Sequence, residues 1–105
     1  MTEDRAFPVL VDVHAEQDIQ RIDAWWREQT SAPMLFRDEL AHMVTLLASS
    51  PQMGVAYRRR GIPGLRRVLL RATRYHVYYV FDGSWVVVLS VWGAVRRRGP
   101  PLTGR

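Results

Sequence analysis

The stretch LRRVLLRATRYHVYYVFDGSWVVVLSVW, residues 65–92, decides the fold. It holds three runs rich in β-branched, aromatic and other apolar residues, at 65–72, 75–81 and 85–92. Asp82-Gly83 lies between the last two runs and is typical of a tight hairpin turn, because glycine accepts the positive φ that such turns need. The stretch therefore predicts three consecutive antiparallel strands.

Two helices are predicted upstream of these strands. Residues 15–28 carry apolar side chains at helical spacing, and residues 33–50 do so again before Pro51 ends the pattern. Pro33 is typical of the first turn of a helix. The connection at 30–32 is so short that the helices should form an antiparallel hairpin. The apolar faces consist of Ala15, Ile19, Ile22 and Trp26, and of Phe36, Leu40, Met43, Val44 and Leu47.

The remaining segments complete one domain over residues 1–105. Residues 7–13 are predicted to form a first strand, with Val9, Val11 and Val13 on one face. Residues 52–64 contain three glycines and an arginine run and predict an exposed loop, and residues 94–105 predict a loose basic tail. The predicted fold class is α+β: a helical hairpin packed on a small antiparallel sheet, in the order β-α-α-β-β-β.

Composition excludes several classes of protein. A chain of 105 residues has room for one hydrophobic core. Without cysteine it can form neither disulfides nor a thiolate zinc site, and its three histidines lack the spacing of metal ligands. We therefore expect no metal and no cofactor. The apolar runs are too short to span a membrane, and none near the N-terminus resembles a signal core, so we expect a cytoplasmic protein.

Charge is divided between the two halves of the chain. Residues 1–53 hold nine acidic side chains and four arginines, a balance of −5, whereas residues 54–105 hold eleven arginines and one acid, a balance of +10. There is no lysine. The arginine fork suits phosphate and carboxylate groups, and a G+C-rich genome would also favour arginine. The division itself predicts an acidic partner for the second half.

Several motifs in this order resemble the RelE/ParE family of bacterial toxins. They are residues 64–71 (GLRRVLLR), 74–79 (RYHVYY) and 91–98 (VWGAVRRR), with the helical hairpin and Ala15, Asp18, Ile19 and Ile22 upstream. The resemblance covers residues 9–98. It implies the toxin half of a type II toxin–antitoxin module, neutralised by an antitoxin encoded beside it. RelE-like members cut messenger RNA in the ribosomal A site, whereas ParE-like members are thought to poison DNA gyrase.

The residues favour the ParE-like branch of this family. RNA cleavage needs a group that activates the 2′-hydroxyl, a proton donor and cations at the phosphate. Arg67 matches a strand cation of RelE-like toxins, but Leu69 is apolar and His76 stands where an arginine would follow. No tyrosine follows Tyr79. We therefore assign no catalytic residue; if the protein is a ribosome-dependent endoribonuclease, the set would be Arg67, His76 and Arg96.

Other readings of these residues remain open. His76 suits a half-buried packing role as well as acid–base chemistry. Trp25 falls off the apolar face of its helix and is either partner-facing or buried between the helices. Besides the two toxin functions, a non-toxic basic nucleic-acid binder fits the charge.

The expected partners are a cognate antitoxin, acidic or amphipathic and forming a hetero-oligomer with the toxin, and DNA gyrase. The ribosome and messenger RNA are the alternative to gyrase. The residues predicted to bind the antitoxin or the target are Trp25, Arg66, Arg67, Arg71, Arg74, Arg96, Arg97 and Arg98.

Overall fold

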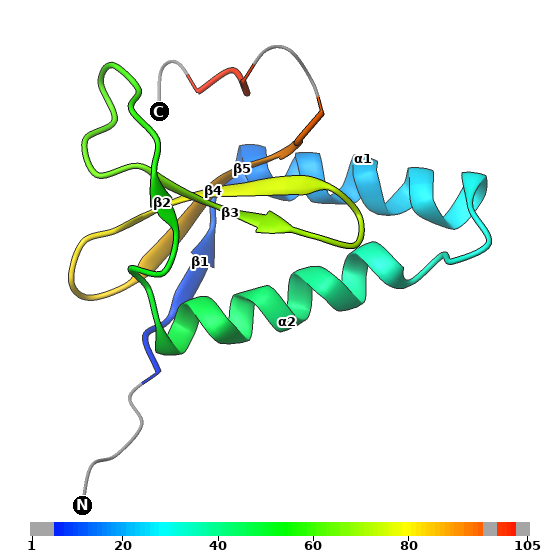
Figure 1. Cartoon of the computed structure of the whole chain (residues 1–105), viewed down its shortest axis with the longest axis horizontal. Helices are drawn as coiled ribbons and strands as arrows, with labels where there is room; N and C mark the ends of the chain where they lie inside the picture. Colours follow the sequence, from blue (N-terminus) through cyan, green and yellow to red (C-terminus); the bar gives the residue numbers. More distant parts are fainter. Residues whose placement is uncertain (1–5, 96–98, 103–105) are drawn as a thin grey trace, which may run out of the picture.

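The computed structural model describes residues 6–95 and 99–102. Two helices and five strands follow one another in a single α+β unit (Figure 1). The fold class and the predicted order of the elements are confirmed, with one additional strand of two residues. The elements are β1 (Val9–Val11), α1 (Val13–Gln29), α2 (Leu35–Ser49), β2 (Val55–Ala56), β3 (Arg66–Leu70), β4 (Tyr75–Phe81) and β5 (Val86–Gly93).

The five strands form one sheet in the order β1-β5-β4-β3-β2. The predicted antiparallel meander of β3, β4 and β5 is confirmed, and its second turn is the expected one, with Gly83 at φ 96°. The sheet is nevertheless mixed, because β1 pairs in parallel with β5, Val9 lying opposite Val86. Two parallel strands need a crossover connection between them. Here the connection from β1 to β5 consists of the two helices and the strands β2, β3 and β4.

Two helix boundaries differ from the predicted ones. Val13 is not on the first strand: it begins α1 and is exposed, because Asp12 caps the helix by accepting a hydrogen bond from the backbone N–H of His14 at 3.0 Å. Pro33 lies in a turn before α2, which begins at Leu35 after Met34. The preceding connection is held by Thr30, whose hydroxyl donates to the Trp26 carbonyl at 2.7 Å.

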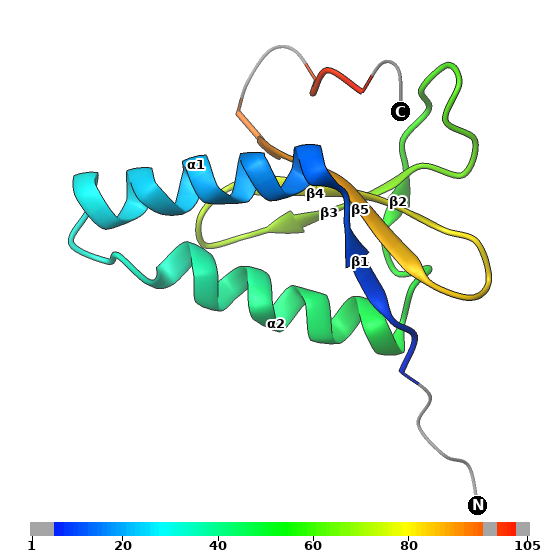
Figure 2. The same ribbon diagram turned by 180° about the vertical axis from the view of Figure 1, so that it is seen from behind.

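Both helices cover the same face of the sheet, which we call the inner face (Figures 1 and 2). The main core lies between them and the sheet, and the predicted apolar faces of both helices contribute to it. Trp26 belongs to this core, as expected, and its indole Nε1 donates to the Tyr75 hydroxyl at 3.0 Å. The buried residues of this core are Ala15, Ile22, Phe36, Leu47, Val68, Leu70, Val77, Tyr79, Val86, Val88 and Val91.

A smaller apolar cluster lies on the opposite, outer face of the sheet. Leu65, Tyr78 and Leu102 form its buried centre, and Tyr57 and Ile62 pack around it. Leu102 is only 2% exposed. The prediction of a loose tail is therefore wrong for residues 99–102, which pack on the outer face.

Two sequence-distant contacts position these peripheral segments. The Arg59 guanidinium donates to the Pro100 carbonyl at 2.7 Å, which fastens the C-terminal segment to the loop. Gly54, before β2, donates its N–H to the Tyr79 hydroxyl at 2.9 Å, and a Cβ there would lie 2.6 Å from that oxygen. Within the described part of the chain, neither helix is both long and apolar enough to cross a membrane.

Candidate functional site

Four side chains from three segments gather on the outer face, and we call them the outer-face cluster: Tyr57, Arg67, His76 and Tyr78. The register of β3 against β4 places Arg67 opposite Tyr78, and His76 lies two residues before Tyr78 on the same face. Tyr57 joins them because its N–H donates to the Leu65 carbonyl at 2.9 Å, just beyond β2. Strand pairing thus brings together residues that are far apart in the sequence.

Arg67 lies at the centre of the outer-face cluster. Its guanidinium carbon lies 4.7 Å from the centroid of the Tyr57 ring, within the range of a cation–π contact. Its Nη1 also donates to the Tyr78 hydroxyl at 3.4 Å. The Tyr57 and Tyr78 rings meet edge to face, with centroids 5.0 Å apart. The guanidinium is therefore held in place by aromatic groups, and none of the ion pairs among the described residues involves it.

His76 is half-buried next to this arginine. Its ring lies 5.9 Å from that of Tyr78, and strand pairing places Leu69 on one side of it and Trp92 on the other. Burial lowers the pKa of His76 below its ordinary value, and the positive charges of Arg67 and Arg74 lower it further. The imidazole is therefore neutral at pH 7, a state in which it can accept a proton.

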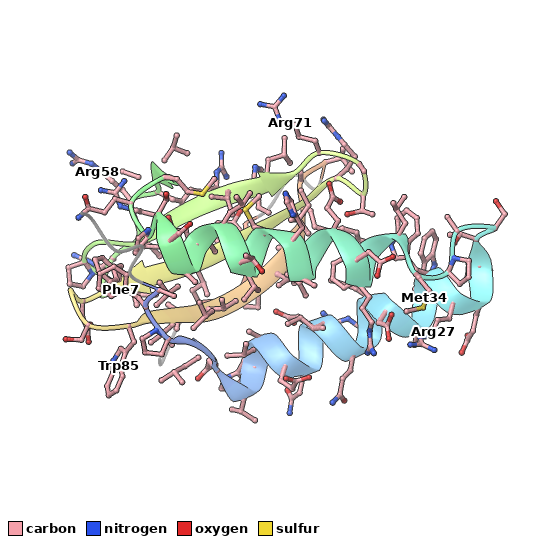
Figure 3. All side chains as sticks on the ribbon, turned by 90° about the horizontal axis from the view of Figure 1, so that it is seen from below. Phe7, Arg27, Met34, Arg58, Arg71 and Trp85 are labelled. Carbon is pink, nitrogen blue, oxygen red and sulfur yellow. The ribbon has the colours of Figure 1, made fainter. Side chains whose placement is uncertain are left out.

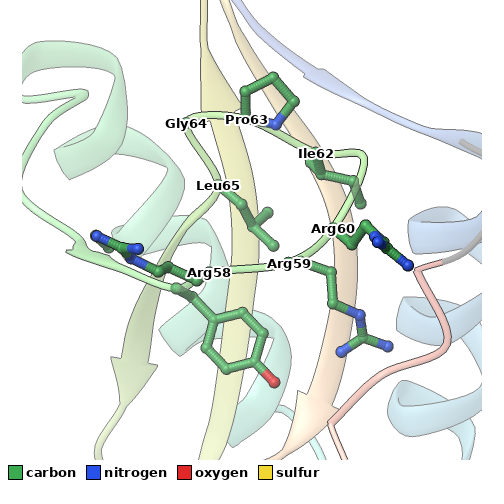
Figure 4. A pocket seen from close by; sticks show the side chains of 9 residues that line it. Arg58, Arg59, Arg60, Ile62, Pro63, Gly64 and Leu65 are labelled. Carbon is green, nitrogen blue, oxygen red and sulfur yellow. The ribbon is translucent and has the colours of Figure 1, made fainter.

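The loop between β2 and β3 forms the rim of this face. Arg58, Arg59 and Arg60 line a pocket with Ile62 and Leu65, and Figure 4 shows Arg58 pointing away from the other two arginines. Arg58 and Arg60 are exposed, as the sequence predicts for this loop. Arg59 is half-buried because it binds the Pro100 carbonyl, so it holds the tail in place.

The predicted binding arginines do not form one surface. Arg67 is on the outer face, whereas Arg66 lies opposite Tyr79, a residue of the inner core, and donates to the Gly54 carbonyl at 2.7 Å. Arg71 and Arg74 are exposed on the β3–β4 turn. The predicted Arg96, Arg97 and Arg98 lie outside the described residues. Among residues 6–95 and 99–102, no group of three or more His, Asp or Glu side chains could hold a metal ion.

Trp25 is the remaining predicted binding residue, and it is 52% exposed. Its ring meets that of Trp26 edge to face, with centroids 5.8 Å apart. The alternative that Trp25 is buried between the helices is therefore excluded. Sequence reasoning did not select Tyr57, because an aromatic residue before an arginine run in a loop has no periodicity that shows what it packs against.

Comparisons with known proteins agree with this architecture. Residues 9–97 match a family model described as the ParE toxin of the type II toxin–antitoxin system parDE. A search of curated proteins gave no significant match. The predicted resemblance to RelE/ParE toxins is thereby confirmed, and the model is that of the ParE-like branch.

Solved structures show the same fold. A chain of the chromosomal ParDE toxin–antitoxin system from Pseudomonas aeruginosa superposes with a TM-score of 0.66 at 16% identity, over 84% of this chain and 96% of that one. A chain of the intact Escherichia coli RelBE toxin–antitoxin complex gives 0.58 at 27% identity, over 87% and 100%. Isolated E. coli RelE gives 0.55 at 27% identity, over 87% of each chain. From the family match over most of its length, the chain belongs to the ParE toxin family of type II toxin–antitoxin systems.

Proposed function

We propose that this toxin is neutralised by a cognate antitoxin and arrests growth by inhibiting DNA gyrase. Membership of the ParE family supports the gyrase target. The observation that carries the proposal is the arrangement of side chains on the outer face of the paired strands: Arg67 is followed on β3 by Leu69, opposite a neutral His76. A phosphoryl-transfer site on messenger RNA would need more positive charge at the phosphate. Both candidate targets place its action in the cytoplasm.

A ribosome-dependent endoribonuclease is the second candidate, because one arrangement favours it. Arg67, His76 and Tyr78 lie on the same face of adjacent strands, and a neutral imidazole beside a guanidinium can serve as a base and a cation. The solved RelE structures share 26–27% identity with the chain. The two targets therefore need a direct experimental comparison.

The test uses purified toxin in two assays side by side. We expect inhibition of DNA supercoiling by gyrase and no codon-phased cuts in a primer-extension assay on translated message. Arg67→Ala and His76→Ala are compared with Arg58→Ala, which removes an exposed arginine outside the outer-face cluster. Cuts that vanish in the first two variants and persist in the third would make the protein an endoribonuclease and overturn the proposed target.

The antitoxin half of the proposal rests on charge. The acidic N-terminal half and strongly basic second half make an acidic or amphipathic segment the natural complement of the strands. The exposed or half-buried arginines suited to it are Arg67 and Arg71, because Arg66 is engaged with the Gly54 carbonyl. The partner to test is the protein encoded by the reading frame adjacent to the toxin gene.

A further inference from the structure

A notch lies where the second half of α1 meets the ends of β4 and β5. It has a volume of about 250 Å³ and is lined by Trp25 and Arg21 of α1, Tyr75 of β4 and Trp92 of β5, among others. We call it the Trp25 notch. None of its lining residues belongs to the outer-face cluster, although Trp92 pairs with His76 across β5 and β4. Nothing in the proposed gyrase or ribonuclease chemistry uses the notch.

The aromatic walls of the Trp25 notch are fixed by contacts behind them. Tyr75 accepts the hydrogen bond from the Trp26 indole at 3.0 Å and packs edge to face on Phe36, with ring centroids 5.2 Å apart. Trp25 in turn packs edge to face on Trp26. A ligand entering the notch would therefore meet rings that are already ordered, and little side-chain entropy would be lost on binding.

The Arg21 side chain, which also lines the notch, is held in place by Asp18. Asp18 binds β5 through one carboxylate oxygen, which accepts from the Ser90 hydroxyl at 2.9 Å and from the Val91 N–H at 3.1 Å. Its other oxygen accepts from the Arg21 guanidinium at 2.9 Å. Asp18 thus positions Arg21 beside the notch, and Arg21 remains largely exposed.

A second arginine adjoins the notch in an unusual backbone conformation. Arg74 precedes Tyr75 and has φ 70°, in the left-handed region that disfavours residues other than glycine. Its carbonyl accepts from the Ala94 N–H at 2.9 Å, just beyond the notch residue Gly93. Glycine would occupy this position with less strain, and the arginine here places a positive charge next to the notch residue Tyr75.

We propose that the Trp25 notch receives one large apolar side chain from an acidic segment of the antitoxin, whose carboxylates pair with Arg21 and Arg74. The inference rests on the proposed antitoxin function. Two observations select this occupant. Arg21, which lines the notch and pairs with Asp18, and Arg74, which precedes Tyr75, are both exposed arginines. A segment in the notch also contacts α1 and the sheet together, so one short peptide spans both surfaces. Tryptophan, tyrosine and arginine are the residues most enriched in the hot spots of protein–protein interfaces.

The test measures binding of the adjacent-frame protein to full-length toxin variants. Trp25→Ala should raise the dissociation constant at least ~30-fold. The matched control is Trp85→Ala: Trp85 is 46% exposed, and Figure 3 shows it at the opposite end of the molecule from Arg27, which follows Trp25 by two residues. The control should change the dissociation constant by less than about twofold.

Arg74→Gly tests the role of the positive charge at position 74 in a protein that keeps its fold. Glycine tolerates the left-handed φ, so the fold should be kept or stabilised, while the complex should weaken several-fold at low salt and lose part of its salt dependence. In parallel, the indole N–H resonance of Trp25 should shift on binding and that of Trp85 should not.

The outcomes separate the inference from the function on which it rests. If wild-type toxin fails to bind the adjacent-frame protein, both the antitoxin function and the notch assignment are wrong. If wild-type toxin binds and Trp25→Ala, folded by circular dichroism, binds equally well, the notch assignment alone is wrong and the antitoxin uses another surface.

Discussion

The two faces of the sheet are built from different kinds of sequence. The inner face is a continuous apolar core between the sheet and two amphipathic helices, with Phe36, Leu70, Val77 and Tyr79 among its fully buried members. The outer face has a small apolar centre around Leu65, Tyr78 and Leu102 and carries an arginine and a histidine in aromatic surroundings. The inner face supplies stability, and the outer face leaves polar groups available for recognition.

Deleting a large side chain from each face should show the largest difference between the two faces in their contribution to the free energy of unfolding. Phe36→Ala should lower the free energy of unfolding by about 3–5 kcal/mol, since this α2 side chain is fully buried and packs on the Tyr75 ring. Leu102→Ala should cost below about 2 kcal/mol, because the chain end can move to close the space. Urea unfolding monitored by circular dichroism measures both. Equal losses would mean that the outer cluster is as important to the fold as the main core.

Gly54 tests how tightly the sheet edge is coupled to the inner core. Gly54→Ala places a methyl group against the Tyr79 hydroxyl and the Arg67 carbonyl and should cost about 1–3 kcal/mol. Tyr79→Phe should cost about 1–3 kcal/mol by leaving the Gly54 N–H unbonded. Removing the hydroxyl also makes room for the methyl group, so the double variant should lose less than the sum. Strict additivity in a double-mutant cycle would show that the two residues do not compete for this space.

The smallest effect concerns His76 on the outer face. Its pKa is lowered in the folded protein by burial and by Arg67 and Arg74. As the pH falls through the ordinary histidine value near 6.5, the unfolded chain takes up a proton that the folded chain resists, so the free energy of unfolding falls with pH.

The contribution of His76 is fully present above that pH, and His76→Phe should flatten this part of the profile. The measurement compares urea unfolding of the two proteins between pH 7.5 and about 5.5. Because the two proteins differ only at residue 76, the difference between their profiles reports on that residue. A profile that is unchanged by the substitution would show that the folded protein does not disfavour the charged imidazole.

Local periodicity was sufficient to predict the inner face. The helical spacing of Ala15, Ile19, Ile22 and Trp26 predicts one apolar face, and the structure has all four at the core. These are patterns over one element, where side-chain direction follows from the backbone repeat. The same reasoning left the position of Trp25 open, and the structure shows it exposed.

The outer face and the strand order depend on contacts that no local pattern specifies. A strand of three residues such as β1 carries too little information to select its neighbour, so its parallel pairing with β5 was not predicted. The composition of residues 94–105 indicates a loose tail, and only the contacts of Pro100 with Arg59 and of Leu102 with Leu65 and Tyr78 show otherwise. Tyr57 joins the outer-face cluster through the same long-range packing.

The pairing of β1 with β5 also determines when the sheet can be completed during synthesis of the protein. Val11 lies opposite Val88, so β1 cannot pair with β5 until nearly the whole chain has been synthesised. At about 5–20 residues per second, that interval is roughly 4–15 s. During this interval the helical hairpin lacks the complete sheet that it covers, and α1 lacks its contacts with β5. The complete sheet, and with it the packing of β5 against α1, can therefore form only after the last strand has been made.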